Sequence, residues 1–198
     1  MAGDDAPETG DDAPETGDVT VVVLAGGRSV RFGSDKLAAP LAGTTVLDHL
    51  LAALPGSWRV VAVGEPRATG REVAWTREDP PGGGPLAGVA AGVAVVRTGL
   101  VAVVAGDMPY AAPALVALAA TLDAAPPGIH AAVGTDDEGV ANPLLAVYRA
   151  AAVRDALPHP AHGRPAKTLL ALAHVAVPVP GAASRDVDTP RDLEDLTP

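Results

Sequence analysis

The sequence predicts an α/β protein, a three-layer α/β/α sandwich built on a mostly parallel sheet. Two continuous aliphatic and β-branched runs, at 19–24 and 100–105, are typical of parallel strands that are buried on both faces. Segments with helical spacing alternate with strand-like runs along the chain, which is the pattern of βαβ units. Hydrophobic residues make up 48% of the 198 positions, so one domain can bury a substantial core.

The strand-like runs are short and separated by turn residues. We expect strands at 19–24, 59–63, 72–75, 100–105, 129–133, 144–148 and 175–179. The run Pro-Pro-Gly-Gly-Gly-Pro at 80–85 has no regular structure available to it and is expected to be a loop. A second long loop, polar in character, is expected between Ala25 and Gly43.

The expected helices begin at cap or proline signals. They lie at 46–54, 86–96, 112–123, 150–157 and 166–172, with a last one starting at Pro190. Thr44 or Thr45 can cap the first helix, and Thr189 with Asp192 can form a capping box at the last. The loops after two buried strands, at 19–24 and 100–105, then open at the carboxyl edge of the sheet, where ligands of such folds bind.

The net charge of −10 is concentrated at the N-terminus. Residues 3–9 and 10–16 are two copies of Gly-Asp-Asp-Ala-Pro-Glu-Thr, and we expect 1–18 to be a disordered acidic leader ahead of a single domain at 19–198. The leader is explained either by a tandem duplication or by a role as an acidic docking arm.

The amino-acid composition also argues against several classes of function. The absence of a basic patch argues against nucleic-acid binding, and no run reaches the ~18–20 apolar residues that cross a bilayer. The chain has no cysteine, so disulfides and thiolate metal sites are excluded. Without a targeting segment, we expect a cytoplasmic protein.

The loop after the first strand has the composition of a phosphate-binding site. It begins Leu24-Ala25-Gly26-Gly27, and glycines there let backbone N–H groups approach phosphate oxygens. Arg28, Arg31 and Lys36 add positive charge in the same loop. A triphosphate needs both kinds of group, although a simple glycine turn with solvated bases is the alternative. The loop matches neither the Walker A pattern nor G-x-G-x-x-G.

Carboxylates stand at three further places. Asp107 directly follows the strand at 100–105, which suits a ligand of Mg²⁺, or alternatively the cap of the next helix. Asp186 and Asp188 lie two positions apart, and we expect only one of them, for which Asp188 is the candidate, to face the site as a second metal ligand. The alternative for both is turn and cap chemistry. Asp79, beside the 80–85 loop, can accept hydrogen bonds from a guanine edge or be a plain loop residue.

Five motifs, taken in order, resemble those of one family. They lie at 24–36, at 85–88 (Pro-Leu-Ala-Gly), at 106–110 (Gly-Asp-Met-Pro-Tyr), at 142–149 (Asn-Pro-Leu to Tyr-Arg) and at 186–193. Together they resemble the molybdenum cofactor guanylyltransferases, the MobA-like members of the nucleotidyltransferase superfamily. The resemblance runs from Val19 to Leu193 and implies a Rossmann-like sheet of the nucleotide-diphospho-sugar transferase type.

The resemblance implies transfer of GMP from GTP to the phosphate of molybdopterin, with Mg²⁺ as cofactor and pyrophosphate as the second product. It also implies partners among molybdoenzymes or cofactor-handling proteins. The nucleotide would contact Leu24, Ala25, Gly26, Gly27, Lys36, Asp79 and Asp107. Lys36, Arg31 and Asp107 would be the catalytic groups, and Asp107 and Asp188 the metal ligands.

Two departures from the family pattern stand out. Gly64 occupies a place where family members often have a nucleotide-binding asparagine. Asp186 and Asp188 replace asparagines near the C-terminus, which would make the acceptor side of the site more negative or give the metal another ligand. The alternatives to guanylyl transfer are a cytidylyltransferase for the same cofactor, a nucleotidyltransferase for another phosphorylated metabolite, and a non-catalytic cofactor-binding protein.

Overall fold

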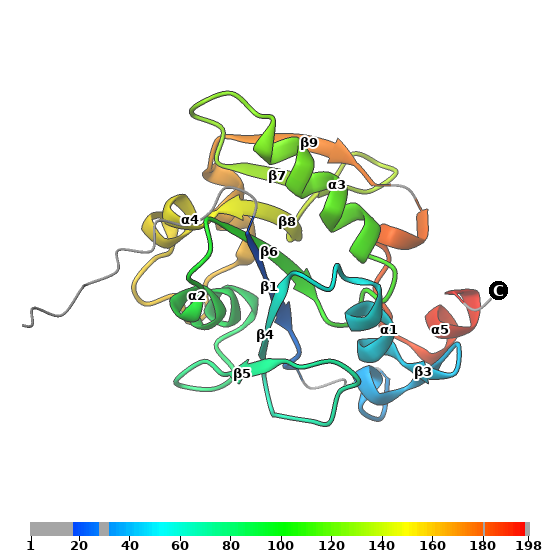
Figure 1. Cartoon of the computed structure of the whole chain (residues 1–198). Helices are drawn as coiled ribbons and strands as arrows, with labels where there is room; N and C mark the ends of the chain where they lie inside the picture. The colour runs from blue at the N-terminus through cyan, green and yellow to red at the C-terminus, as the bar shows by residue number, and fades with distance from the viewer. Residues whose placement is uncertain (1–17, 28–31, 180, 197–198) are drawn as a thin grey trace, which may run out of the picture.

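A seven-stranded sheet forms the middle of the computed structural model, which describes residues 18–27, 32–179 and 181–196 (Figure 1). The strand order is β5-β4-β1-β6-β8-β7-β9. The strands are β1 (Val19–Leu24), β4 (Arg59–Val63), β5 (Ala74–Thr76), β6 (Leu100–Ala105), β7 (Ala131–Thr135), β8 (Ala141–Arg149) and β9 (His174–Pro178). Within this sheet β8 runs against its neighbours and the other pairs are parallel, which confirms the mostly parallel sheet.

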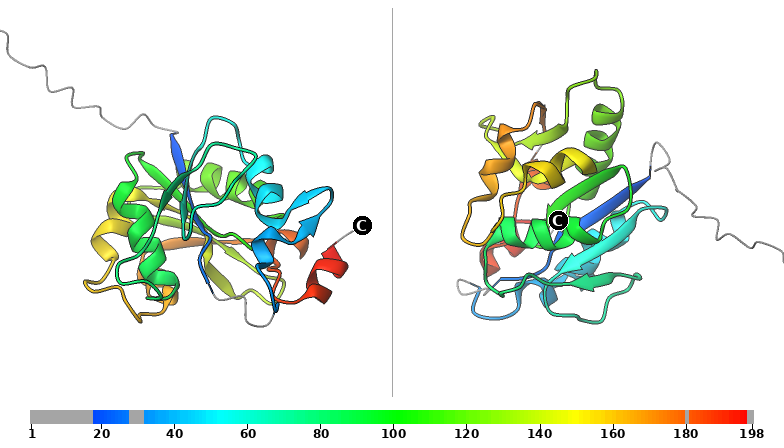
Figure 2. Two further views of the ribbon diagram at one scale, coloured as in Figure 1. Left: turned by 90° about the horizontal axis from the view of Figure 1, so that it is seen from below. Right: turned by 90° about the vertical axis from the view of Figure 1, so that its left-hand side faces the viewer.

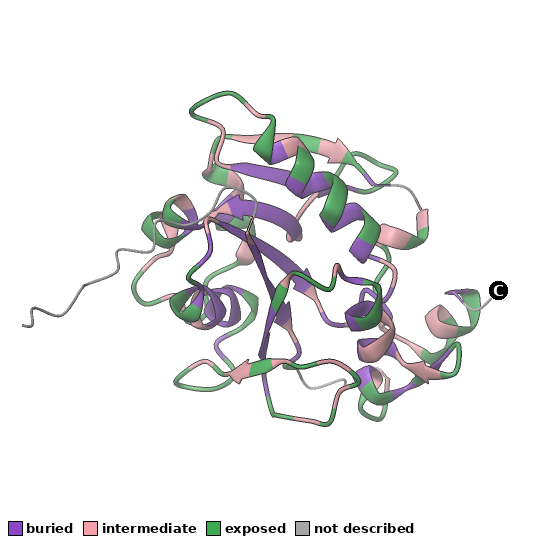
Figure 3. Cartoon of the chain, viewed as in Figure 1, coloured by how far each residue is buried: buried purple, intermediate pink, exposed green. Residues whose placement is uncertain are grey.

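Helices cover both faces of the sheet and complete the expected three layers (Figures 1 and 2). On one face lie α1 (Val46–Ala53) and α3 (Ala112–Asp123), whose leucines pack with one side of β1 and β6. On the other face lie α2 (Pro85–Val95), α4 (Ala150–Ala156) and the 3-10 helix η2 (Ala166–Ala171). The purple strands in Figure 3 lie between these layers, so the central strands have no polar face.

The double cover explains the sequence of the central strands. In β1, residues 19–23 are all buried, and so are residues 100–104 in β6. A strand covered on both sides cannot alternate polar and apolar residues, so it becomes a continuous apolar run. On α2, a Cβ added to Gly92 would lie 2.4 Å from Val22, so glycine at this position lets the helix approach β1.

A smaller unit beside the sheet was not expected from the sequence. The 3-10 helix η1 (Lys36–Ala38) is followed by a hairpin of β2 (Pro40–Leu41) and β3 (Thr44–Thr45). The terminal helix α5 (Pro190–Leu196) lies next to it (Figures 1 and 2). Leu193 of this helix packs on the buried cluster of Ala39, Leu41 and Val46. This contact joins the segment after β1 to the end of the chain.

Several boundaries differ from the expectation. The strand expected at 72–75 is Ala74–Thr76, the one at 129–133 is Ala131–Thr135, and the one at 144–148 extends over Ala141–Arg149. The helix expected at 166–172 is the 3-10 helix η2, and a short 3-10 helix η3 (Gly181–Ser184) was not anticipated. The expected leader lies, except for Asp18, outside the described residues. In the described part of the chain, no helix is both long and apolar enough to span a membrane.

Candidate active site

The loops after β1 and β6 meet at the carboxyl edge of the sheet. The two strands are parallel neighbours, with Leu24 opposite Ala105, and the Gly106 N–H donates to the Leu24 carbonyl at 2.9 Å. The turn Gly26–Gly27 and Asp107 therefore line one cavity, of about 1130 Å³. Its walls also include Val63, Gly64, Glu65, Arg77, Glu78, Gly82, Gly84, Pro85, Met108, Asn142, Leu144, Ser184 and Asp186.

The end of β4 holds the glycine turn in place. The Ala25 N–H donates to the Val63 carbonyl at 2.9 Å, and Ala25 is buried beneath the turn. Gly64 has φ 151°, and a Cβ there would lie 2.8 Å from the Ala25 carbonyl group. Glycine is required because the two backbones touch, so a side chain such as asparagine would have to displace the turn that carries Gly26 and Gly27.

Lys36 connects this edge of the sheet to the end of the chain. Asp35 caps η1 by accepting the Leu37 N–H at 3.2 Å, and buried Leu37 fixes the helix against the core. The Lys36 Nζ forms ion pairs with Asp107 and with Asp188, the latter at 2.9 Å. Partial burial lowers the pKa of Lys36, but the hydrogen bonds and charges of the two carboxylates outweigh it and leave the pKa above its ordinary value.

Three carboxylates converge around Lys36. Asp107, Asp186 and Asp188 each offer an oxygen, and these oxygens all lie within 4.8 Å of one another. The expectation that only one of Asp186 and Asp188 faces the site was wrong. Side chains two apart in a non-helical segment point to the same side, and the intervening Val187 is the one that is turned inward and fully buried. The Val187 N–H donates to the Asp107 carbonyl at 2.9 Å, which fixes the segment to the loop after β6.

This donor set fits a divalent cation. Oxygen ligands from carboxylates are those that Mg²⁺ and similar hard ions take. The Oδ1 atom of Asp107 is buried and has no hydrogen-bond partner among the described residues. Such an oxygen is costly unless a cation or donor satisfies it. The pKa of Asp186 is raised, first by desolvation of its carboxyl group and then by the negative charges of Asp107 and Asp188. The three acids therefore repel each other and would gain from a second cation.

A family model described as a MobA-like NTP transferase domain matches residues 21–177. The chain belongs to this family. It is 36% identical over 145 residues to a probable molybdenum cofactor guanylyltransferase of Chloroflexus aggregans, an alignment that covers 67% of this chain and 66% of that relative. It is 32% identical over 201 residues to a protein of the same name from Natronomonas pharaonis, covering 88% and 95% of the two chains.

A solved structure shares the fold of this MobA-like domain. Molybdopterin-guanine dinucleotide biosynthesis protein A from Archaeoglobus fulgidus superposes with a TM-score of 0.71 at 25% identity, over 89% of this chain and 96% of that one. The fold class expected from the sequence, down to the nucleotide-diphospho-sugar transferase type, is thereby confirmed.

The MobA-like domain brings together most of the residues that were singled out from the sequence. Leu24, Gly26, Gly27 and Asp107 line the cavity, Ala25 is buried behind it, and Lys36 joins Asp107 to Asp188. Asp79 is exposed and is not among the cavity-lining residues, whereas its neighbour Glu78 lines the cavity and accepts the Gly82 N–H at 3.1 Å. Arg28 and Arg31 lie outside the described residues.

Sequence reasoning missed several polar residues of the cavity wall, among them Glu65, Arg77, Asn142 and Ser184. Asn142 was quoted only as part of the motif around β8, and its position directly before Pro143 at the start of a strand was the available signal. Ser184, on η3, gave no signal, because a lone serine in a Gly-Ala-Ala-Ser segment has no distinctive neighbours.

Proposed function

We propose that this chain transfers GMP from GTP to the phosphate of molybdopterin and releases pyrophosphate. The names of its relatives support the choice of donor and acceptor. The observation that carries the proposal is that Asp107 and Asp186 line the same cavity as the Gly26–Gly27 turn, while Lys36 pairs with Asp107 and with the neighbouring Asp188. A polyphosphate in this cavity meets the amide donors of the turn on one side and, on the other, the metal-binding carboxylates with their partner Lys36.

Each predicted residue has a role in this reaction. The amides of Gly26 and Gly27 bind phosphate oxygens, Leu24 lines the wall beside the nucleotide, and the buried Ala25 supports the turn from behind. Lys36 and Arg31 neutralise charge on the triphosphate, and Asp79, which is exposed next to the cavity-lining Glu78, binds the guanine. Asp107 and Asp188, joined by Asp186, hold Mg²⁺, which when bound supplies charge neutralisation at the α-phosphate and the leaving group.

The reaction needs no general base from the protein. An oxygen of the acceptor phosphate forms a bond to the α-phosphorus of GTP. The bond from that phosphorus to the α–β bridging oxygen breaks, and pyrophosphate leaves with the electron pair. The attacking phosphate is already ionised at neutral pH, so the chain has to position it and stabilise charge rather than remove a proton.

The test is pyrophosphate release and dinucleotide formation by the purified protein with GTP, MgCl₂ and molybdopterin. Asp107→Asn should lower the rate by about 10²-fold or more, because it weakens the binding of the Mg²⁺ ion that would neutralise charge on the α-phosphate and the leaving group. Asp155→Asn, an exposed position on α4, is the matched control. Wild-type turnover in Asp107→Asn would contradict the proposed role of Asp107, and no turnover by the wild type would favour a non-catalytic cofactor-binding protein.

The nucleotide is tested by thermal shift with GTP, CTP, ATP and UTP in the presence of Mg²⁺. GTP should stabilise the protein most, because a ligand that binds the folded state raises its unfolding temperature. Equal or greater stabilisation by CTP would replace guanylyl transfer with cytidylyl transfer.

We also propose that residues 19–198 form one domain and that the leader at 1–18 takes no part in catalysis. Removing residues 2–17 should leave the turnover of GTP within about twofold at physiological salt, where charges more than ~8 Å apart in solvent are largely screened. A larger loss would assign the leader a role in substrate or partner binding. The expected recipients of the product, molybdoenzymes or cofactor-handling proteins, can be sought with the same truncated chain.

A further inference from the structure

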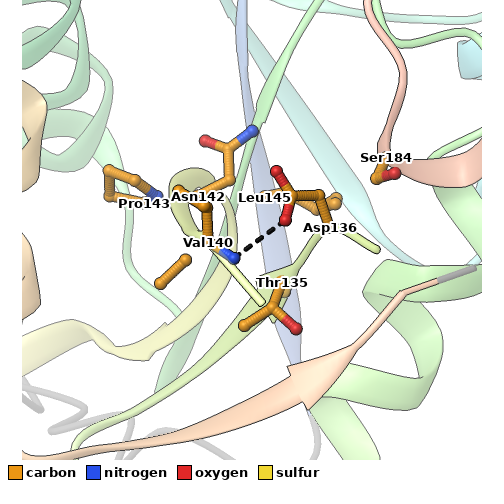
Figure 4. Close-up of a pocket in the computed structure, with 9 residues that line it drawn as sticks. Thr135, Asp136, Val140, Asn142, Pro143, Leu145 and Ser184 are labelled. Carbon is orange, nitrogen blue, oxygen red and sulfur yellow. Dashed lines mark hydrogen bonds between the residues drawn. The ribbon is translucent and has the colours of Figure 1, made fainter. Parts of the chain in front are cut away.

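A second, smaller cavity adjoins the proposed nucleotide site. It measures about 240 Å³ and is lined by the end of β7, the turn after it and the start of β8 (Figure 4). Asn142 and Ser184 line both cavities, so the two share a wall. The volume corresponds to about eight waters at ~30 Å³ each, which is room for a flat bicyclic ring.

The position of this cavity on the sheet separates it from the nucleotide. Glu65, Glu78 and Gly82 follow or adjoin β4 and β5, at one end of the large cavity. The glycine turn and Asp107 follow the central strands β1 and β6, and the small cavity lies beyond them at β8 and β7. Along the sheet edge, the carboxylates and Lys36 thus stand between the two ends, where the reacting phosphates have to meet.

The turn after β7 holds one carboxylate in a fixed orientation. A β-bulge between Val133 and Gly134 shifts the register of β7 and β8. The Asp136 Oδ1 then accepts the N–H groups of Glu138 at 3.0 Å and of Val140 at 2.8 Å. Figure 4 shows the Val140 bond and the other carboxylate oxygen turned away from it. Among the described residues that second oxygen has no hydrogen-bond partner, so it is an acceptor available to a ligand.

Asn142 supplies the complementary group. Its Oδ1 accepts the Leu144 N–H at 2.9 Å, which fixes the amide plane and leaves the two N–H donors of the side chain for a ligand. The cavity therefore offers a negative acceptor and a neutral amide donor, both held by backbone contacts. A ring edge with adjacent N–H donors and a nearby carbonyl matches this pair.

We propose that the small cavity binds the 2-amino-4-oxopyrimidine edge of the acceptor's pterin ring. The Asp136 carboxylate accepts the ring N–H and the exocyclic amino group, and the Asn142 amide donates to the ring carbonyl. This inference rests on the proposed function, because the pterin belongs to the proposed acceptor. It places the acceptor's ring at the β7–β8 end and its phosphate toward Asp107. Guanine carries the same edge, so the test must tell the two rings apart.

The experiment measures the binding of 6-hydroxymethylpterin to the full chain by quenching of pterin fluorescence, and GTP binding by thermal shift with Mg²⁺. Asp136→Asn keeps an oxygen for the backbone N–H groups but replaces the second acceptor with a donor. Its affinity for the pterin should fall about tenfold or more, as expected for loss of a charged hydrogen-bond pair. Asp137→Asn, the exposed neighbour that does not line the cavity, should match the wild type.

The two binding measurements separate this inference from the proposed function. The expected result is weaker pterin binding by Asp136→Asn with unchanged stabilisation by GTP. Equal pterin binding by wild type and Asp136→Asn, or no pterin binding by the wild type at millimolar concentration, would overturn the inference while leaving the GTP site intact. Loss of GTP stabilisation in Asp136→Asn would also overturn it, by assigning the cavity to guanine. A wild type that binds pterin but not GTP would refute the proposed function instead.

Discussion

In two parts of this protein, a single positively charged side chain contacts several oxygen atoms. One is a lysine that pairs with carboxylates, and the other is an arginine that donates to backbone carbonyls. At the candidate active site, Lys36 pairs with the carboxylates of Asp107 and Asp188. Behind α1, the guanidinium of Arg71 donates to backbone carbonyls at the helix end and in the turn that follows. These are the carbonyls of Leu51 (3.3 Å), Leu54 (3.1 Å), Pro55 (2.9 Å), Gly56 (3.5 Å) and Trp58.

The difference lies in what the oxygens can do without the cation. Backbone carbonyls at the end of a helix are fixed in position and carry the negative end of the helix dipole. The rigid, planar guanidinium group, with its five N–H donors, can bind several of them at once. Carboxylates can bind another cation, and a lysine on a flexible stem can leave them. We infer that Arg71 is a permanent structural contact, whereas Lys36 can exchange its carboxylate partners for triphosphate oxygens.

The largest effect expected from this comparison is on catalysis. Lys36→Met should lower kcat/KM for GMP transfer by about 10²–10³-fold, because the loss of a single charge-stabilising donor has that cost in comparable sites. With Mg²⁺ present, the unfolding temperature should change little, because the metal would neutralise the carboxylates that have lost the lysine. Arg59→Met, at the opposite edge of the sheet, is the control. A fully active Lys36→Met variant would remove the distinction between the two cations.

The second effect is on stability. Arg71→Met should lower the free energy of unfolding by about 2–3 kcal/mol, because several carbonyls lose a charged donor at once. Urea denaturation measures this, with Arg97→Met as a control that loses donors to Ala94 and Val96 on an exposed helix end. The KM for GTP should stay the same. A shift in KM without a loss of stability would contradict a purely structural role for Arg71.

The Lys36 and Arg71 clusters also show which features of the structure could be predicted from the sequence and which could not. The strands at 19–24 and 100–105 were predicted in full, because burial on both faces forces a continuous apolar run. The meeting of the Gly26 turn with Asp107 followed from the rule for carboxyl ends of parallel strands. The edge strand β5 was misplaced, since a short strand that is only partly buried has no such run.

Other features depended on contacts that have no local signal. The hydrogen-bond partners of Arg71 are backbone carbonyls. Every residue has a backbone carbonyl, so these contacts cannot be predicted from a pattern of side chains. The joint approach of Asp186 and Asp188 to Asp107 required the hydrogen bond from Val187 to the Asp107 carbonyl, across 80 positions of the chain. The need for glycine at Gly64 came from its contact with Ala25, a residue on another strand end.

A third, smaller effect tests the exchange itself. Without nucleotide, Lys36→Met should bind Mn²⁺ about tenfold more tightly than the wild type. The reason is that a unit positive charge a few Å from a divalent ion opposes the binding of that ion. The effect is no larger because the wild-type lysine can move away and relieve part of this repulsion. Electron paramagnetic resonance of free Mn²⁺ measures the affinity directly and needs no turnover. In the wild type, GTP should strengthen Mn²⁺ binding more than it does in Lys36→Met. Equal Mn²⁺ affinity in the two proteins would show that Lys36 does not compete with the metal.

The smallest expected effect comes from replacing one cation type by the other. Arg71→Lys should cost about 1 kcal/mol in urea denaturation, less than Arg71→Met, because an ammonium keeps the positive charge near the helix end but has three donors where the fork has five. An ammonium reaches fewer of the carbonyls at one time, so the remaining ones must turn to water. If Arg71→Lys were as destabilising as Arg71→Met, the planar fork itself would be what α1 requires. If Arg71→Lys had no effect on stability, a positive charge alone would suffice at this position. The difference from Lys36 would then come entirely from the kind of oxygen that is bound, backbone carbonyl or carboxylate, and not from the kind of cation.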